Sequence, residues 1–150
     1  MTSPLALATL FLLLPIVGFA EENWTSFQNG GRLSFPADES FELSPDKLPK
    51  WQVSLGGYGQ SSPVKFGDLL YVTFVNGEDK EQLNVWAINF NSGEVAWKRE
   101  AKNSTPEKNN NYVSRAAPSP VCDANGVIAF FEGGNIVAYS PTGELRPIQN

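Results

Sequence analysis

The chain has 150 residues and a formal net charge of −5, from 11 Lys and Arg against 16 Asp and Glu, and it contains no His. A surface of this sign repels phosphate backbones, so no nucleic acid is expected as a partner. Without His the chain has no His-based triad, general base or metal site. Cys122 is the only cysteine, so no intrachain disulfide can form, and we expect its side chain to be buried rather than reactive.

The N-terminal residues predict export. An apolar run from Leu5 to Ile16 is broken only by Thr9 and Pro15, and small residues then lead to Ala20, after which we expect a secretory signal (residues 1–20) to be cleaved. The run is shorter than the about 20 residues that span a bilayer, and no second run follows, so no membrane span is expected. An uncleaved anchor is the alternative. Either way the domain is exported, to the periplasm, the cell surface or the medium.

Residues 21–50 form an irregular arm rich in Asn, Gly, Ser, Pro and acidic residues. Its isolated aromatic residues follow no helical or strand period, and we expect them to pin the arm to a folded body. They are Trp24, Phe27, Phe35 and Phe41. From Trp51 onward short β-branched and aromatic runs alternate with Gly, Asn, Asp and Pro turns, and no amphipathic helix can be drawn. The fold class is therefore all-β.

Two predicted strands are apolar on both faces. In Leu69–Val75 and in Val85–Phe90 apolar residues occupy both sets of alternating positions, which is typical of inner strands that lie between two packed layers. The polar segment Asn76–Gln82 between them predicts an exposed hairpin loop. A turn then leads to a third strand that contains Val95 and Trp97.

This unit recurs later in the chain. The residues 62–64 (Ser-Pro-Val) and the strand after them are echoed by residues 119–121 (Ser-Pro-Val) and a strand at Val127–Phe131. The segment Val85–Ile88 is echoed by Ile136–Tyr139, and the turn Ser92–Glu94 by Thr142–Glu144. Repeated units made of short strands in this way are typical of β-propeller blades. Each blade is a four-stranded antiparallel sheet that covers the apolar face of its neighbour.

Four segments of the first copy carry a resemblance to a known family: Ser-Ser-Pro-Val (61–64), Gly-Asp-Leu-Leu-Tyr-Val (67–72), Val-Trp-Ala-Ile-Asn (85–89) and Ser-Gly-Glu-Val-Ala-Trp (92–97). Together they resemble the repeat of the PQQ-type (pyrroloquinoline-quinone-like) propellers, including the outer-membrane assembly propellers. The recurring positions of that family are occupied here by Ala87, Asn89, Gly93, Glu94 and Trp97, and in the second copy by Ala138, Gly143 and Glu144. The resemblance implies that the closing Trp packs between blades. Trp24 with Phe27 also resembles the Trp-x-x-Phe arm that precedes many such propellers.

The repeat region occupies residues 51–150, as a first blade (51–100), a loop (101–116) and a partial second blade (117–150). The second copy passes Leu145 and Pro147 without a closing Trp. Members of the family close a ring from several blades, whereas this chain holds about one full and one partial blade. We therefore expect a fragment of a larger propeller, whose partners are the missing blades, another protein, or further copies that associate through open blade edges.

The residues favour a scaffold over an enzyme. The resemblance implies that enzymes of the family hold PQQ in the channel with calcium, a catalytic Asp and often a vicinal disulfide, which a single cysteine cannot form. The acidic residues of the 76–82 loop are expected to be solvated, and Asp123–Gly126 is expected to be a turn rather than a calcium loop. Gly56, Gly57 and Gly59 lack the Lys and the helix of a phosphate-binding loop.

We expect an exported, noncatalytic, protein-binding scaffold with no catalytic residue, cofactor or metal ligand. The long polar connection between the copies is a natural place for a contact patch, and Tyr112 and Arg115 are its residues of the type enriched at binding hot spots. The alternative is part of a quinone-dependent oxidoreductase, which would bind PQQ with calcium. Asn23 and Asn103 each begin an Asn-x-Thr glycosylation pattern.

Overall fold

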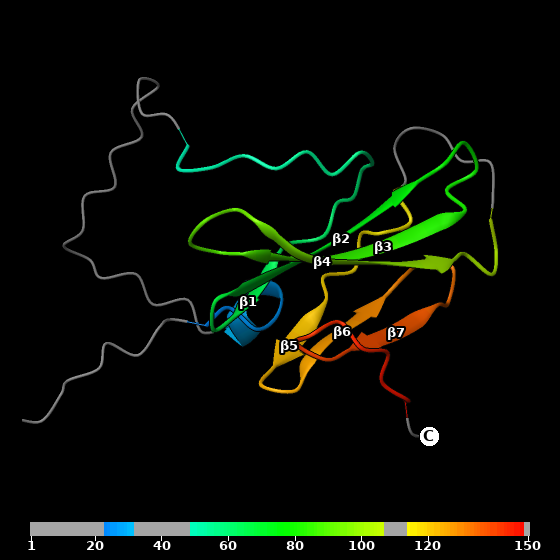
Figure 1. Cartoon of the computed structure of the whole chain (residues 1–150). Coiled ribbons are helices and arrows are strands. Elements are labelled where there is room, and N and C mark those ends of the chain that lie inside the picture. The colour runs from blue at the N-terminus through cyan, green and yellow to red at the C-terminus, as the bar shows by residue number, and fades with distance from the viewer. Residues whose placement is uncertain (1–22, 32–48, 107–113, 149–150) are drawn as a thin grey trace, which may run out of the picture.

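The computed structural model describes residues 23–31, 49–106 and 114–148. A short 3₁₀ turn, η1, spans Phe27–Gly31. The first sheet contains β1 (Val64–Phe66), β2 (Leu69–Asn76), β3 (Gln82–Asn89) and β4 (Val95–Lys102), and the second contains β5 (Val121–Asp123), β6 (Gly126–Phe130) and β7 (Ile136–Tyr139). Both sheets are antiparallel, with their strands in chain order (Figure 1). The all-β fold of propeller blades is confirmed. Among the described residues no helix is long and apolar enough to cross a membrane.

Strands β2 and β3 are buried on both faces, as their sequences predict. On one face Tyr71 and Val85 join a core cluster with the second sheet. On the other face Phe74 and Trp86 belong to a separate cluster, and their rings meet edge to face with centroids 5.1 Å apart. The predicted hairpin loop between the two strands is present at residues 77–81, and its tip is exposed.

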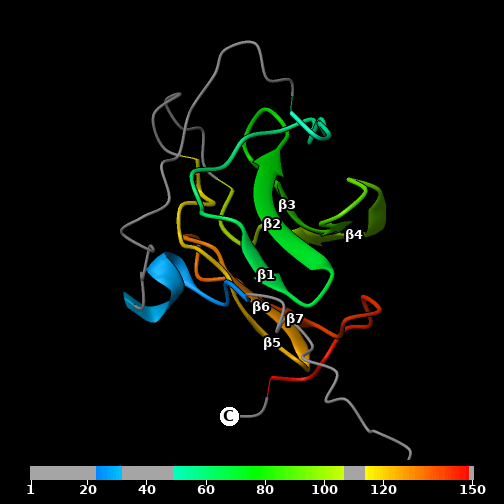
Figure 2. The same ribbon diagram turned by 90° about the vertical axis from the view of Figure 1, so that its left-hand side faces the viewer.

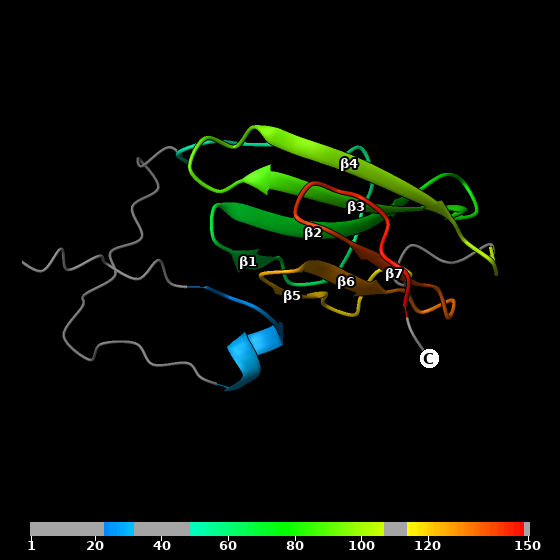
Figure 3. The ribbon, with the colours of Figure 1, turned by 60° about the horizontal axis from the view of Figure 1, so that its bottom comes forward.

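The two sheets stack face to face, and the larger cluster fills the space between them (Figures 1 and 3). The ring of Trp97 lies between the rings of Tyr71 and Tyr139, at centroid distances of 5.9 and 5.8 Å. The second sheet contributes small and branched side chains from β6 and β7, including Val127 and Ala129. The core therefore joins the two repeats, because each sheet removes an apolar face of the other sheet from water.

The strand pairing fixes how the two repeats correspond in space. Tyr71 pairs with Ala87 in the first sheet, and Ile128 pairs with Ala138 in the second. Because Ala87 and Ala138 are equivalent in the repeat, Ile128 occupies the place of Tyr71. The first sheet buries its Tyr71 face against the second sheet, whereas the second sheet turns its Ile128 face outward. The sheets thus stack head to tail, as consecutive blades do.

Two tryptophans each dock onto the turn of a repeat, Trp97 onto the turn of the second repeat and Trp51 onto the turn of the first. The indole Nε1 of Trp97 donates to the carbonyl of Pro141 at 2.8 Å, and its ring lies against Gly143. The indole of Trp51 donates to the carbonyl of Phe90 at 2.9 Å, and its ring lies against Gly93. Both glycines have positive φ, 82° and 77°, and a Cβ atom on either would fall within 3 Å of the ring. The turn glycine is needed both for its backbone conformation and for the Trp contact.

The N-terminal arm pairs with the inner edges of both sheets. Trp24 and Lys65 of β1 form a bridge, in which the Trp24 amide donates to the Lys65 carbonyl at 2.9 Å. The amide of Cys122 in β5 donates to the carbonyl of Thr25 at 2.9 Å. Figure 2 shows the arm beside β1 and β5. Phe27 is 60% exposed, so the expectation that it pins the arm is wrong. The arm is held by its backbone and by the Asn23 side-chain oxygen, which accepts the Gly67 amide at 2.8 Å, while Phe35 and Phe41 lie outside the described residues.

We expect the substitution Gly143→Ala to destabilise the fold more than Gly134→Ala. Both glycines have positive φ, 82° and 87°, so both changes strain the backbone, but only at Gly143 would the new Cβ meet Trp97, at 2.9 Å. Overpacking of this kind costs about 1–3 kcal/mol. Urea unfolding followed by tryptophan fluorescence measures the difference. Equal losses for the two variants would mean that the Trp contact contributes nothing.

We expect the thiol of Cys122 to be unreactive in the native chain. Burial, and secondarily the charge of Asp123, raises the pKa of Cys122 from 9.0 to about 11. A raised thiol pKa means that the folded chain holds the proton more tightly than the unfolded chain, so stability falls as the pH rises from about 9 to about 11. At pH 8 the native thiolate fraction is roughly 100-fold below that of the unfolded chain. The rate of labelling by a chromogenic disulfide, with and without denaturant, measures this, and equal rates would contradict it.

Candidate protein-binding face

Three segments meet at one end of the two sheets. They are the β2–β3 hairpin (77–81), the residues after β4 (103–106) and the β6–β7 hairpin (131–135), which project on the same side (Figure 1). We call these three segments the platform. Since they come from both repeats, the platform exists only when the two sheets are stacked.

Asn103 is the centre of the platform. It is 1% exposed, and its side-chain amide donates to the carbonyl of Lys80 at 3.1 Å and accepts from the amide of Thr105 at 3.0 Å. Its own backbone amide donates to the carbonyl of Glu81 at 2.8 Å. One buried side chain therefore ties the β2–β3 hairpin to the end of β4. The same burial removes Asn103 as an accessible glycosylation site in the folded chain.

The next two residues connect the first repeat to the second. The hydroxyl of Ser104 donates to the side-chain oxygen of Asn135 at 2.9 Å, and the hydroxyl of Thr105 donates to the carbonyl of Gly133 at 3.0 Å. A Cβ atom on Gly133 would lie 2.6 Å from the Thr105 hydroxyl oxygen, so the hairpin can approach this closely only with glycine there. The platform is thus cross-linked by hydrogen bonds between both blades.

The exposed surface of the platform combines acidic side chains with one aromatic residue. Glu78, Asp79 and Glu132 are exposed. Tyr58 borders them and is 41% exposed, and the ammonium of Lys80, only 3% exposed, lies 5.1 Å from the centre of its ring. The carboxylate of Glu81 folds back over its own hairpin and accepts the Asp79 amide at 3.0 Å. Exposed carboxylates on two hairpins and an exposed tyrosine are side chains that can interact with basic groups.

The structure brings one of the two predicted contact residues to the platform. Arg115 has φ 64° and is flanked by the buried Ser114 and Ala116, and its carbonyl accepts the Glu132 amide at 3.4 Å. It therefore lies at the base of the β6–β7 hairpin. Tyr112 lies outside the described residues. Sequence reasoning missed Tyr58 and Asn103 as platform residues, although the polar run after β4 was a signal for a turn.

The repeat positions form a separate structural site at the opposite end of the sheets. The side-chain oxygen of Asn89 accepts the amides of Asn91 and Ser92 at 2.9 and 3.0 Å, and its backbone bonds to Gly93 and Glu94 close the turn. In the second repeat Ser140 replaces this Asn, and its hydroxyl accepts the Glu144 amide at 3.0 Å. Ala87 and Ala138 are buried, at 0 and 4% exposure.

Two other motifs have local structural explanations. The Asp123 carboxylate accepts the Asn125 amide at 2.8 Å, which makes Asp123–Gly126 a turn. The backbone at Gly57 and Gly59 runs against β2, where a Cβ on Gly59 would lie 2.6 Å from the carbonyl of Thr73. Within the described ranges no group of three or more His, Cys, Asp or Glu residues is placed to hold a metal ion.

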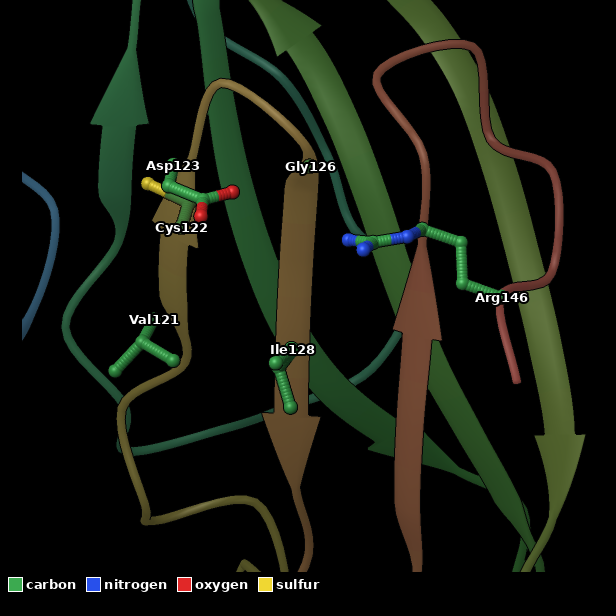
Figure 4. Close-up of a pocket in the computed structure, with 6 residues that line it drawn as sticks. All are labelled: Val121, Cys122, Asp123, Gly126, Ile128 and Arg146. Atoms are coloured by element: carbon green, nitrogen blue, oxygen red, sulfur yellow. The ribbon is translucent and has the colours of Figure 1, made fainter. Parts of the chain in front are cut away.

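A shallow hollow of about 170 Å³ lies on the outward face of the second sheet. Figure 4 shows Val121, Cys122 and Asp123 on β5 and Gly126 and Ile128 on β6, with the Arg146 guanidinium reaching toward Gly126. That guanidinium donates to the carbonyl of Asn125 at 3.0 Å. Burial raises the pKa of Cys122 to about 11, which disfavours its thiolate.

Comparison with known proteins agrees with this architecture. A family model described as outer membrane protein assembly factor BamB matches residues 38–149, which is more than half of the chain and includes both sheets. No curated protein matches the chain. The stacked four-stranded and three-stranded sheets, the repeated Trp–Gly docking and this match lead to one assignment. The chain belongs to the PQQ-type β-propeller repeat family represented by the BamB assembly factor.

Proposed function

We propose that the chain is an exported, noncatalytic propeller module that binds another protein through the platform. The observation that carries the proposal is the hydrogen-bonded connection of both repeats at Asn103, Thr105 and Gly133, beside the exposed ring of Tyr58. A surface that is rigid before binding loses little conformational entropy on association. The partner proposed here is a protein segment that carries basic side chains.

The position of the arm supports a noncatalytic role. In a propeller the innermost strands line the central channel, which is where a channel ligand would contact the blades. Here Trp24 pairs with β1 and Thr25 accepts from β5, so protein already occupies those inner edges. The arm competes with any cofactor for this space.

Export rests on two separate supports. The apolar run before Ala20 has the outline of a secretory signal. The family match carries the description of an outer membrane assembly factor, which favours an envelope location for this chain as well. We place the module in the periplasm or at the cell surface.

The substitution Asn103→Ala should weaken the platform. It removes the donor to the buried carbonyl of Lys80, a loss of about 1–3 kcal/mol, whereas the amide of the exposed Thr105 can bond to water instead. Asn91→Ala is the matched control, because this exposed Asn bonds to Asp68 at the surface and its loss should cost less than about 0.5 kcal/mol. Thermal unfolding of the two variants compares them. A change at Asn103 as small as that at Asn91 would contradict a rigid platform.

A photoreactive side chain at the platform should capture one defined protein in the envelope of the native host. We would place the photoreactive residue at Glu78 or Glu132, with Lys98 on β4 as the matched exposed position away from the platform. The expected result is one adduct from the two platform positions, absent from Lys98 and reduced several-fold by Tyr58→Ala. Adducts of equal yield from all three positions, or none, would overturn the proposal. A rise in melting temperature on addition of PQQ and calcium would instead favour the oxidoreductase.

A further inference from the structure

The sequence contains three Asn-Gly pairs, Asn29–Gly30, Asn76–Gly77 and Asn125–Gly126. Asparagine is a chemically labile residue, and it is most labile before glycine. The backbone nitrogen of the following residue attacks the side-chain carbonyl carbon of asparagine, and glycine leaves this approach open because it has no Cβ atom. All three pairs lie within the described residues, so their surroundings can be compared.

The packing of the second sheet requires glycine at position 126. Gly126 has φ 121°, and a Cβ atom there would overlap the carbonyl oxygen of Tyr139. Asn125 is exposed in the turn between β5 and β6. An accessible asparagine is therefore followed by a position that admits no larger residue, which keeps the reactive pair in place.

Two charged side chains bond to the groups that react at Asn125. The Arg146 guanidinium donates to the carbonyl of Asn125 at 3.0 Å. This carbonyl and the Gly126 amide belong to one peptide group, so the cation stabilises the negative charge that develops when the amide loses its proton and attacks. The Asp123 carboxylate accepts the side-chain amide of Asn125 at 3.2 Å, where it favours the positive charge of that nitrogen as ammonia leaves. Figure 4 shows Asp123 and Arg146 with Gly126 at the start of β6.

The glycine of the pair Asn76–Gly77 faces a carboxylate instead. A Cβ atom on Gly77 would overlap the carboxylate of Glu81, so this carboxylate lies directly against the glycine. A negative charge here opposes the loss of a proton from the Gly77 amide. Asn76 is also held at the end of β2, where it pairs with Gln82 and its side-chain oxygen accepts the Asn84 side-chain amide at 2.8 Å. The fold therefore favours the reaction at Asn125 and disfavours it at Asn76.

We propose that Asn125 is a site of spontaneous modification, at which the Gly126 nitrogen displaces ammonia from the Asn125 side chain with the help of Arg146. A bond forms between the Gly126 nitrogen and the side-chain carbon, the bond from that carbon to Nδ2 breaks, and the amide proton leaves with the ammonia. Water then opens the cyclic imide at one of its two carbonyl groups. The product carries aspartate or isoaspartate at position 125.

The modification changes the charge and the bonding of the turn. A carboxylate cannot replace the donor that Asn125 offers to Asp123, and two carboxylates then repel each other within one turn. The modified turn therefore has one more negative charge and one hydrogen bond fewer. Gly126 begins β6, whereas the platform hairpin follows the end of β6, so the proposal is independent of the platform.

The first test compares the pairs within one sample. The purified chain is incubated at neutral pH, either folded or in denaturant, and peptide mapping by mass spectrometry follows deamidation at each asparagine with time. In the folded chain Asn125 should react several-fold faster than Asn76. In denaturant the two rates should become similar, because only the folded chain holds the charged groups in place. Equal rates in the folded chain would overturn the proposal, and so would a difference that persists unchanged in denaturant.

The second test isolates the guanidinium. Arg146→Gln keeps a side-chain donor and removes the charge, so it should slow deamidation at Asn125 several-fold, and Arg146→Lys should recover part of the rate. Asn29 is the internal control, since its described contacts are to the uncharged Thr25 amide and Ser26 carbonyl, and its rate should not change. Circular dichroism confirms that each variant is folded. Modification of Asn125 at the native rate in the folded Arg146→Gln chain would contradict the proposal.

Discussion

The first sheet buries apolar side chains on both of its faces, so it needs a cover on each side. Burial of a large apolar side chain contributes about 1.5–3 kcal/mol, and Phe74, Trp86, Tyr71 and Val85 divide between the two faces. No turn or edge within a single sheet can supply this cover. The second sheet covers one face, and Trp51–Leu55 covers part of the other. The stacked arrangement of the chain follows from this requirement.

The stacked sheets are also held together by contacts at their two ends. Stacked sheets must be held in register, and the Trp–Gly contacts do this at one end through an indole that bonds to the carbonyl of the next turn. At the other end Asn103, Ser104 and Thr105 hold the hairpins of both repeats together. One end is thereby held by an indole and a turn glycine, whereas the other is held by a cluster of polar side chains.

The N-terminal arm covers part of the sheet edge formed by β1 and β5. Strands β1 and β5 would expose amides and carbonyls toward the axis, and the arm satisfies part of this edge with the backbone of Trp24 and Thr25. The arm thus acts as a short inner strand that bridges two blades. It links residues that precede the first sheet to the packing of both repeats.

The sequence by itself determined the all-β class, the family and the position of most strands. It did so because strands with two apolar faces, such as those of Leu69–Val75 and Val85–Phe90, have a local pattern that only stacked sheets satisfy. The repeat then predicted the turn at Gly143 from the turn at Gly93. Arg115 was expected in a contact patch from its residue type alone, and this role stays a prediction; the structure places its backbone at the base of the β6–β7 hairpin.

The tertiary structure decided which segments meet. The sequence predicted that Asn103 is a glycosylation acceptor, but its side chain is buried in the structure. The Lys80 carbonyl and the Thr105 amide both bond to it, although these two groups are distant from each other along the chain. Phe27 was expected to pin the arm, yet backbone pairing of Trp24 does so, and backbone hydrogen bonds leave no trace in side-chain pattern. Trp51 likewise showed its role only when its indole was placed beside Gly93. Local pattern fixes the elements, whereas contacts between distant residues fix the surfaces.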